Sequence, residues 1–264
     1  MNTAETNRTI AYLKSINKWA HITLPKNRDI NPRTRRGDIN LLTYKDYKAY
    51  HDEVCRFANV KKHVIFEDEE TVNKLCNKIR ARSPLPFQWG MVHGARNGKF
   101  TNWLFESLGI PIKATELSPA VSSMHSRTLE GGWDFHEVQK GWLNRFDFIW
   151  SSSFFHSYDP YLCIQRWMST VKRNANGQCI LLHHAYGSAP KAVERDIPFG
   201  ANLGETICLI NAAGRDPRNK GKNFHVETVW GKQDGVSEEK TEYKQYIVVV
   251  PTLTEKESWT PKKV

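Results

Sequence analysis

The sequence lacks any long, uninterrupted apolar run. No window of its 264 residues approaches the roughly 18 consecutive apolar residues needed to span a bilayer. Residues 1–25 also lack the compact apolar stretch, ending in small residues, that marks a secretory signal. We therefore expect a soluble, unexported and cytoplasmic protein with no membrane partner.

Cysteines are few and widely separated. The chain has five of them, an odd number, and none forms a CxxC or similar metal-ligand spacing. They are Cys55, Cys76, Cys163, Cys179 and Cys208. This pattern argues against a disulfide scaffold and against a structural zinc site, so we expect reduced thiols that are mostly buried.

Aromatic residues and positive charge are plentiful. The 9 Trp, 9 Tyr and 12 Phe exclude a disordered chain and can form a sizeable core. The formal net charge is +10, and residues 1–40 carry eight basic residues against three acidic ones. A second basic cluster runs over 215–222. Both regions could attract nucleic acid, phosphates or anionic sugars. The alternative is that they are solvated surface charge, since neither shows the interleaved aromatic residues of a platform that stacks on bases.

The first 86 residues predict a helical N-terminal extension with a basic arm. Apolar residues recur at helical spacing over 10–20, 46–58 and 69–79, with a polar loop over 25–38 between the first two. The Ser83-Pro84-Leu85-Pro86 segment then interrupts the helical pattern. We place a domain boundary there, with one unit over 1–86 and another over 87–264.

From residue 87 onward, strand patterns alternate with helix patterns. Strands are expected over 88–93, 112–116, 133–136, 146–151 and 178–183, and helices over 100–108, from Ser118-Pro119, over 161–171 and over 203–213. Alternation of this kind implies a mostly parallel sheet covered on both faces. The last two strands, 224–230 and 243–250, are joined by a link too short for a crossover helix, so they should form an antiparallel hairpin.

A glycine-containing turn and an acidic residue follow the first two of these strands. Gly94 and Gly98 flank Ala95-Arg96-Asn97, and Glu116 ends the next strand 18 residues after Gly98. The glycines let the backbone turn sharply and approach a ligand, and a carboxylate at a strand tip can accept hydrogen bonds from both hydroxyls of a ribose.

In this order of motifs, residues 87–250 resemble the class I S-adenosylmethionine-dependent methyltransferases. The resemblance implies an α/β, Rossmann-like, seven-stranded and mostly parallel sheet with helices on both faces and a C-terminal antiparallel hairpin. It also implies S-adenosylmethionine as cofactor. The positions that match cofactor-binding positions of the family are His93, Gly94, Ala95, Arg96, Gly98, Glu116, Leu117, Asp134, Phe135, Ser151 and Ser152.

The glycine turn departs from the family pattern at two places. Val92 and His93 precede Gly94, where members of the family often have an acidic residue. Arg96 stands at the position of the usual middle glycine. Its side chain could point outward or bind the carboxylate of the cofactor.

Histidines are the candidate catalytic bases, because their unperturbed pKa lies near neutrality. His156 is the first candidate, since it follows the fourth strand at the edge where open α/β sheets bind ligands. His183 comes second, together with its neighbour His184. For each of them a purely structural role is the alternative. A metal site from His156, Asp159 and His183 has no supporting ligand spacing, so we expect no metal.

Several functions are compatible with this pattern. The leading interpretation is methyl transfer to a small molecule or glycan, with the segments over 188–190 and 197–202 either covering the acceptor or serving as plain connections. The alternatives are a nucleic-acid methyltransferase that uses the basic arm and a non-catalytic cofactor-binding module. Ser151-Ser152-Ser153-Phe154 replaces the Asn/Asp-Pro-Pro-aromatic motif of amino-methylating DNA enzymes, and the turn does not form the GxGxxG of nicotinamide dehydrogenases.

Overall fold

The computed structural model describes residues 21–23, 38–41, 44, 46–64, 67–119, 129–174, 177–185, 197–230 and 244–254. The helix expected over 10–20, most of the basic arm, the body of the helix begun by Ser118-Pro119, the turn at 188–190 and the link over 231–241 lie outside these residues.

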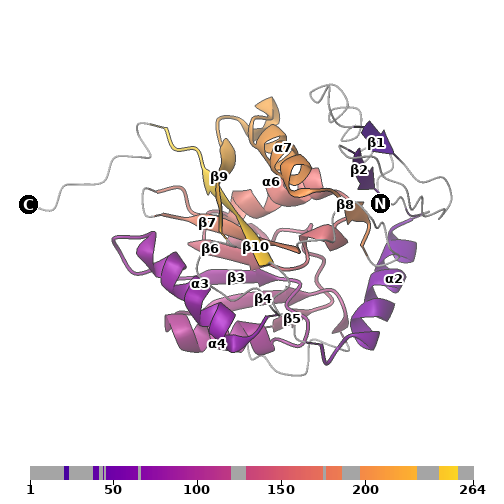
Figure 1. The fold of residues 1–264 in the computed structure, drawn as a ribbon, viewed down its shortest axis with the longest axis horizontal. Coiled ribbons are helices and arrows are strands. Elements are labelled where there is room, and N and C mark those ends of the chain that lie inside the picture. The colour runs from indigo at the N-terminus through magenta and orange to yellow at the C-terminus, as the bar shows by residue number, and fades with distance from the viewer. Residues whose placement is uncertain are drawn as a thin grey trace, which may run out of the picture.

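A mostly parallel sheet forms the centre of the protein (Figure 1). Its strand order is β5-β4-β3-β6-β7-β10-β9. The strands are β3 (Gly90–His93), β4 (Ile112–Glu116), β5 (Leu129–Gly131), β6 (Phe148–Ser151), β7 (Cys179–Ala185), β9 (Phe224–Trp230) and β10 (Lys244–Pro251). The first five strands in this order, from β5 through β4, β3 and β6 to β7, are parallel to one another. Strand β10 pairs antiparallel with both β7 and β9. The parallel sheet and the C-terminal antiparallel hairpin are confirmed.

The third strand was predicted in the wrong place. Residues 133–136 form no strand, and the three-residue β5 precedes them at the edge of the sheet. The body of the sheet therefore has six strands of four or more residues, where seven were expected, with β5 as a short addition. Gly132 ends β5 in the left-handed region at φ 74°, and the Asp134 carboxylate then accepts a hydrogen bond from the His136 N–H at 2.9 Å. Asp134 thus closes a turn, a local bond that competes with strand pairing.

Helices cover both faces of the sheet. In Figure 1, α3 (Glu69–Ala81) and α4 (Lys99–Leu108) lie on one side, and α6 (Pro160–Thr170) and α7 (Leu203–Gly214) lie on the other. Each side has its own apolar core, one including Leu75 and Trp150 and the other including Trp167 and Ile210. Because α3 shares a core with the sheet, it packs as part of one body with it. The boundary after Pro86 stays a prediction.

Aspartates fix the start of three predicted helices. Asp46 caps α2 (Tyr47–Val60) by accepting a hydrogen bond from the Ala49 N–H at 2.8 Å, and Asp68 caps α3 in the same way. Asp159 accepts from the Leu162 N–H at 2.9 Å, with Pro160 in the first turn of α6. Such caps satisfy backbone donors that a helix leaves unpaired, which is why these boundaries could be predicted.

A second, small sheet joins distant parts of the chain. It has the order β1-β2-β8, with β1 (His21–Thr23) parallel to β2 (Asp38–Leu41) and β8 (Phe199–Gly200) antiparallel to β2. Phe199 is fully buried and its ring stacks on Phe155 at a centroid distance of 5.3 Å. The described part of the expected acceptor cover over 197–202 is therefore packed into the fold.

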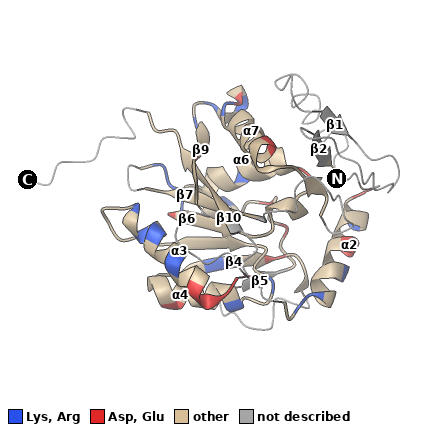
Figure 2. Cartoon of the chain, in the orientation of Figure 1, with Lys and Arg blue, Asp and Glu red and all other residues tan. Residues whose placement is uncertain are grey.

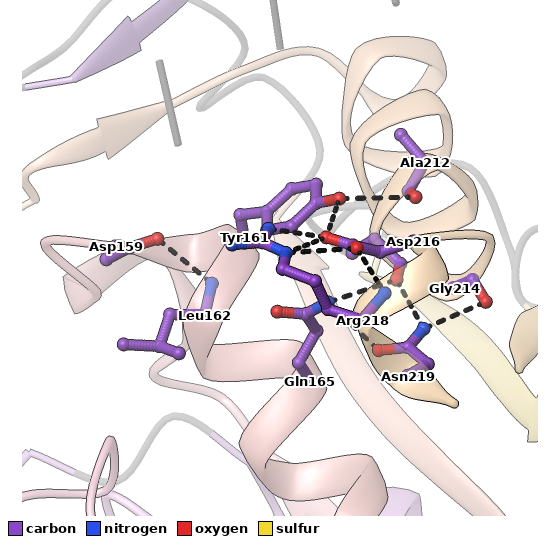
Figure 3. A network of polar contacts seen from close by, with 10 residues as sticks. Asp159, Tyr161, Leu162, Gln165, Ala212, Gly214, Asp216, Arg218 and Asn219 are labelled. Carbon is purple, nitrogen blue, oxygen red and sulfur yellow. Dashed lines mark hydrogen bonds and ion pairs between the residues drawn. The ribbon is translucent and has the colours of Figure 1, made fainter. Parts of the chain in front are cut away.

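A polar network joins α6 to the connection after α7 (Figure 3). The buried Asp216 carboxylate accepts hydrogen bonds from Tyr161 Oη at 2.8 Å and from Arg218 Nε at 2.8 Å. One 3-10 turn, Pro217–Asn219, is the only helical structure within the basic cluster over 215–222, all of which is described. Asp216 thus fixes the start of that cluster against the core.

All five cysteines lie in described residues and carry free thiols, and Cys76, Cys163 and Cys179 are buried. In the described ranges of the chain, no helix is long and apolar enough to cross a membrane.

Candidate functional site

The carboxyl ends of three parallel strands meet at one edge of the sheet. His93, the last residue of β3, lies in register with Thr115 on β4 and with Ser151 on β6. Open α/β sheets bind their ligands at this edge. The glycine turn begins directly after His93 and therefore lies at the centre of it.

The two glycines of the turn are required by its conformation. Gly94 has φ 68° and Gly98 has φ 75°, both in the left-handed region. A Cβ on Gly94 would lie 2.3 Å from Ser153 Oγ, a severe overlap. Gly98 is the N-terminal cap of α4. The close approach of Gly94 to the segment after β6 leaves room there only for a residue without a side chain.

Glu116 connects the turn to the end of β4. Its carboxylate accepts hydrogen bonds from the backbone N–H of Arg96 at 2.7 Å and of Ser118 at 3.0 Å. The side chain is buried, and burial raises its pKa, although the two N–H donors offset part of this rise. Glu116 therefore positions the turn as well as lining the space next to it.

Arg96, at the position predicted for a middle glycine, has a left-handed conformation. Its φ is 50°, and its Nη1 donates to the carbonyl oxygen of Lys61 at 3.0 Å. Asn97 makes a parallel contact, donating from Nδ2 to the Lys62 carbonyl oxygen at 2.9 Å. The Arg96 guanidinium and the Asn97 amide thus tie the turn to the segment that follows α2.

One half of the candidate site is a cleft beside Glu116, which we name the Glu116 cleft. It encloses about 480 Å³, part of it open to solvent. Its walls are Val54, Phe57, Ala58 and Lys61 from α2 and its end, together with Gly94, Arg96, Glu116, Leu117, Phe135, Ser153 and His156. Helix α2 thus covers the sheet edge, and the mixture of apolar walls and a few polar groups is typical of small-ligand sites.

The other half is a pocket on the far side of the turn, which we name the Glu67 pocket. It is lined by Val64, Glu67, Val92, Gly94, Ala95, Arg96, Asn97, Phe100, Ser152 and Ser153. Gly94, Arg96 and Ser153 line both halves. The two halves are therefore neighbouring cavities that share part of the glycine turn as a wall, and we call them together the groove.

Sequence reasoning missed Glu67. The residue opens the acidic run Glu67-Asp68-Glu69-Glu70, and such a run is typical of the start of a helix. Its neighbours behave in that way, with Asp68 as the cap of α3. No signal in the sequence separates Glu67, which is only 3% exposed, from these solvated acids.

Two expected cofactor contacts, His93 and Ser151, and one candidate base, His184, are buried. His93 is buried in the core, stacks on Trp167 at 4.7 Å and approaches Thr115 Oγ1 at 2.9 Å. Burial lowers its pKa to about 3, so it is neutral. Ser151 Oγ donates to the His93 carbonyl oxygen at 3.0 Å. His184 is likewise buried, with a pKa lowered to about 4 by burial. None of these three side chains is in the lining of either cavity.

Asp134, expected beside the adenine of the cofactor, is engaged inside the protein. It accepts from the backbone of His136, and His136 Nδ1 lies 2.6 Å from the same carboxylate oxygen. The other ring nitrogen of His136 lies 2.7 Å from Ser157 Oγ. Burial alone would raise the pKa of Asp134, but the contacts with His136 outweigh it and hold the pKa low. Of the expected adenine pair, only Phe135 lines the Glu116 cleft.

Of the two candidate bases, His156 lines the groove, whereas His183 contacts it only through Glu67. His156 ends the 3-10 turn Phe154–His156 and lines the Glu116 cleft, with Tyr50 Oη 3.3 Å from its carbonyl oxygen. His183 lies on β7 with Nδ1 3.2 Å from Glu67 Oε1. Over the described ranges, no group of three or more His, Cys, Asp or Glu side chains is arranged to hold a metal ion.

Comparison with known proteins identifies the fold. No protein-family model matches the sequence, and no curated protein matches it either. Among solved structures, a chain of the complex between the Trm112 methyltransferase activator of Haloferax volcanii and its candidate methyltransferase is 15% identical, with a TM-score of 0.55 over 78% of this chain and 98% of that one. A SAM-dependent methyltransferase from Leishmania major is 9% identical, with a TM-score of 0.53 over 76% of this chain and 83% of that one.

The CurJ carbon methyltransferase is 13% identical, with a TM-score of 0.50, and the match covers 77% of this chain and 59% of that one. At such identities a structural likeness reports the fold and leaves the activity open. The chain thus has the Rossmann-like fold of the class I S-adenosylmethionine-dependent methyltransferases.

Proposed function

We propose that this protein is an S-adenosylmethionine-dependent methyltransferase whose acceptor is a small molecule or glycan. The observation that carries the proposal is the groove across Gly94, which has Glu116 at the end of the second strand of a methyltransferase-like sheet. Glu116 supplies a buried carboxylate in the Glu116 cleft, and Leu117 and Phe135 supply apolar side chains beside it. The residues present therefore fit the cofactor.

The chain's own residues have distinct roles in this proposal. When bound, S-adenosylmethionine supplies an activated methyl group. Glu116 binds the ribose hydroxyls, the apolar side chains of Leu117 and Phe135 pack against the base, and α2 excludes water from above. Holding the reactants in this way supplies proximity and orientation, which are the main requirements of a methyl transfer.

For a hydroxyl acceptor, a proton has to leave the attacking oxygen. His156 is the candidate general base, because the residue lines the Glu116 cleft and is half-buried. His93 and His184 are excluded from this role, since both are buried and their pKa values are far below neutrality.

The position of α2 favours a small acceptor over a nucleic acid. Four residues from α2 and its end line the Glu116 cleft, so the sheet edge is covered and is not an open platform. The Lys and Arg residues of the described chain are scattered over many elements (Figure 2), and two of them, Lys61 and Arg96, line the Glu116 cleft. A nucleic-acid site would be expected to gather a larger basic patch beside the groove.

Titration calorimetry with S-adenosylmethionine and S-adenosylhomocysteine, with NAD as a control ligand, tests the cofactor assignment. We expect binding of the first two and not of NAD. Glu116→Ala should weaken both by about 1 to 3 kcal/mol through lost hydrogen bonds, whereas the exposed Glu106→Ala should have no effect. A wild-type protein that binds neither ligand would refute the proposal, and an unchanged affinity in Glu116→Ala would remove Glu116 from the site.

His156→Gln tests the base. We expect unchanged affinity for S-adenosylhomocysteine and a fall of roughly 100-fold or more in the rate of S-adenosylhomocysteine release with a hydroxyl acceptor found by screening. The pH dependence of that rate should lose its neutral inflection in the variant. Full activity in His156→Gln would assign the proton to another group.

A further inference from the structure

A buried carboxylate forms part of the wall of the Glu67 pocket. Glu67 precedes α3 and is 3% exposed. Tyr246 Oη donates to its Oε2 at 2.9 Å, and His183 Nδ1 lies 3.2 Å from its Oε1. The rings of His183 and Tyr246 stack on each other at a centroid distance of 5.3 Å. These contacts hold the carboxylate in one orientation, and a carboxylate accepts several hydrogen bonds at once.

The Glu67 pocket presents charges of both signs. Arg96 lines it together with Glu67, so a cation and an anion from separate parts of the chain border the same space. A group that carries both an ammonium and a carboxylate is the complement of such a wall. A buried charge is tolerated best when an opposite charge meets it, and this condition favours an ionic ligand group over an apolar one.

The position of the pocket relative to Glu116 indicates which ligand group would enter it. Gly94, Arg96 and Ser153 line both halves of the groove, with Glu116 in one half and Glu67 in the other. S-adenosylmethionine has a ribose on one side of its sulfonium and an amino-acid group on the other. A cofactor with its ribose at Glu116 that crosses Gly94 would bring its amino-acid end into the Glu67 pocket.

The strand before the glycine turn offers no negative charge for that end. Val92 and His93 are both buried there, and His93 is neutral. Within the described lining of the pocket, Glu67 is the acidic side chain. The segment between α2 and α3 therefore supplies an anion that β3 lacks.

Given the cofactor of the proposed function, we propose that Glu67 binds the ammonium group of S-adenosylmethionine, with Tyr246 and His183 as positioning residues for its carboxylate. The assignment makes the N-terminal segment part of the cofactor site. It also gives the pocket a ligand class, namely nucleosides that carry an aminoalkyl chain on the 5′ sulfur.

Calorimetry of the full-length protein with three ligands tests this assignment. S-adenosylhomocysteine carries the whole amino-acid group, decarboxylated S-adenosylmethionine keeps only the ammonium, and 5′-methylthioadenosine has neither. Glu67→Gln should weaken the first two by about 10-fold or more and leave 5′-methylthioadenosine within about 2-fold, since a hydrogen bond to a charged group is lost. The matched control is Glu70→Gln, an exposed acid on α3, which should change none of the three affinities.

Tyr246→Phe provides a second variant if Glu67→Gln does not fold, because it keeps the carboxylate and removes one of its donors. It should weaken the two ammonium ligands by a smaller factor and again spare 5′-methylthioadenosine. An equal loss for all three ligands would make Glu67 a structural residue, and no loss for any would exclude the contact; either result overturns the assignment. A wild-type protein that binds none of the three refutes the proposed function itself, which is a different outcome.

Discussion

At the scale of single residues, the glycine turn shows how one position serves two requirements. Gly94 has to adopt a left-handed φ and has to leave space for Ser153. At Arg96 only the first requirement applies. Its left-handed φ of 50° costs energy for a residue with a side chain, and its hydrogen bond to the segment after α2 compensates for this cost. A departure from the family pattern at Arg96 is therefore compatible with the turn, whereas one at Gly94 would not be.

Gly94→Ala should demonstrate this difference. The added Cβ meets Ser153 Oγ at 2.3 Å and Ser153 Cβ at 2.4 Å, and the left-handed φ is unfavourable for alanine. We expect a loss of about 2 to 3 kcal/mol in the free energy of unfolding, measured by chemical denaturation, and a loss of cofactor affinity in the protein that remains folded. Gly109→Ala also has a left-handed φ but no neighbour within 4 Å, so it should cost only about 1 kcal/mol. Equal costs for the two variants would contradict the close approach at Gly94.

At the scale of elements, sequence patterns predicted what local chemistry determines. Helix α2 was predicted because an aspartate precedes it and apolar residues recur along one of its faces. Strand β4 was predicted from its short, mostly apolar run. The alternation Trp133-Asp134-Phe135-His136 looked like a strand for the same reason. Its side-chain hydrogen bonds override that pattern, and a periodicity analysis does not detect such bonds.

The candidate site was predictable only where it follows a strand end. Glu116 and Gly94 could be found because the order of strands places them at one edge. Glu67 and the small sheet that pairs Leu41 with Phe199 depend on contacts between segments far apart in the sequence. In a single sequence such contacts leave no periodic signal, so the sequence did not predict that residues of α2 and Glu67 line the groove.

At the scale of the whole molecule, the network in Figure 3 fastens the half of the fold that lies opposite α3 and α4. Burial alone would raise the pKa of Asp216, but hydrogen bonds from Arg218 and Tyr161 outweigh it and lower the pKa to about 2. The pKa of Asp216 is therefore lower in the folded protein than its value of 3.8 in the unfolded chain. The carboxylate stabilises the fold at pH values above 3.8, and this contribution is lost as the pH falls toward the folded pKa of about 2. The shift corresponds to about 2 kcal/mol.

Asp216→Asn should therefore destabilise the protein in a pH-dependent manner. We expect a loss of about 2 kcal/mol in the free energy of unfolding at neutral pH, measured by urea denaturation, because Arg218 and Tyr161 then face an uncharged partner. The difference between wild type and variant should shrink as the pH falls from about 4 toward about 2, where the wild-type carboxylate also becomes neutral. Asp52→Asn is the matched control: its carboxylate is exposed and paired with Lys48 on one helix, so the change should be below about 0.5 kcal/mol. A difference between wild type and Asp216→Asn that stays constant over this range would mean that Asp216 acts through its shape and hydrogen bonds, and that its charge contributes nothing.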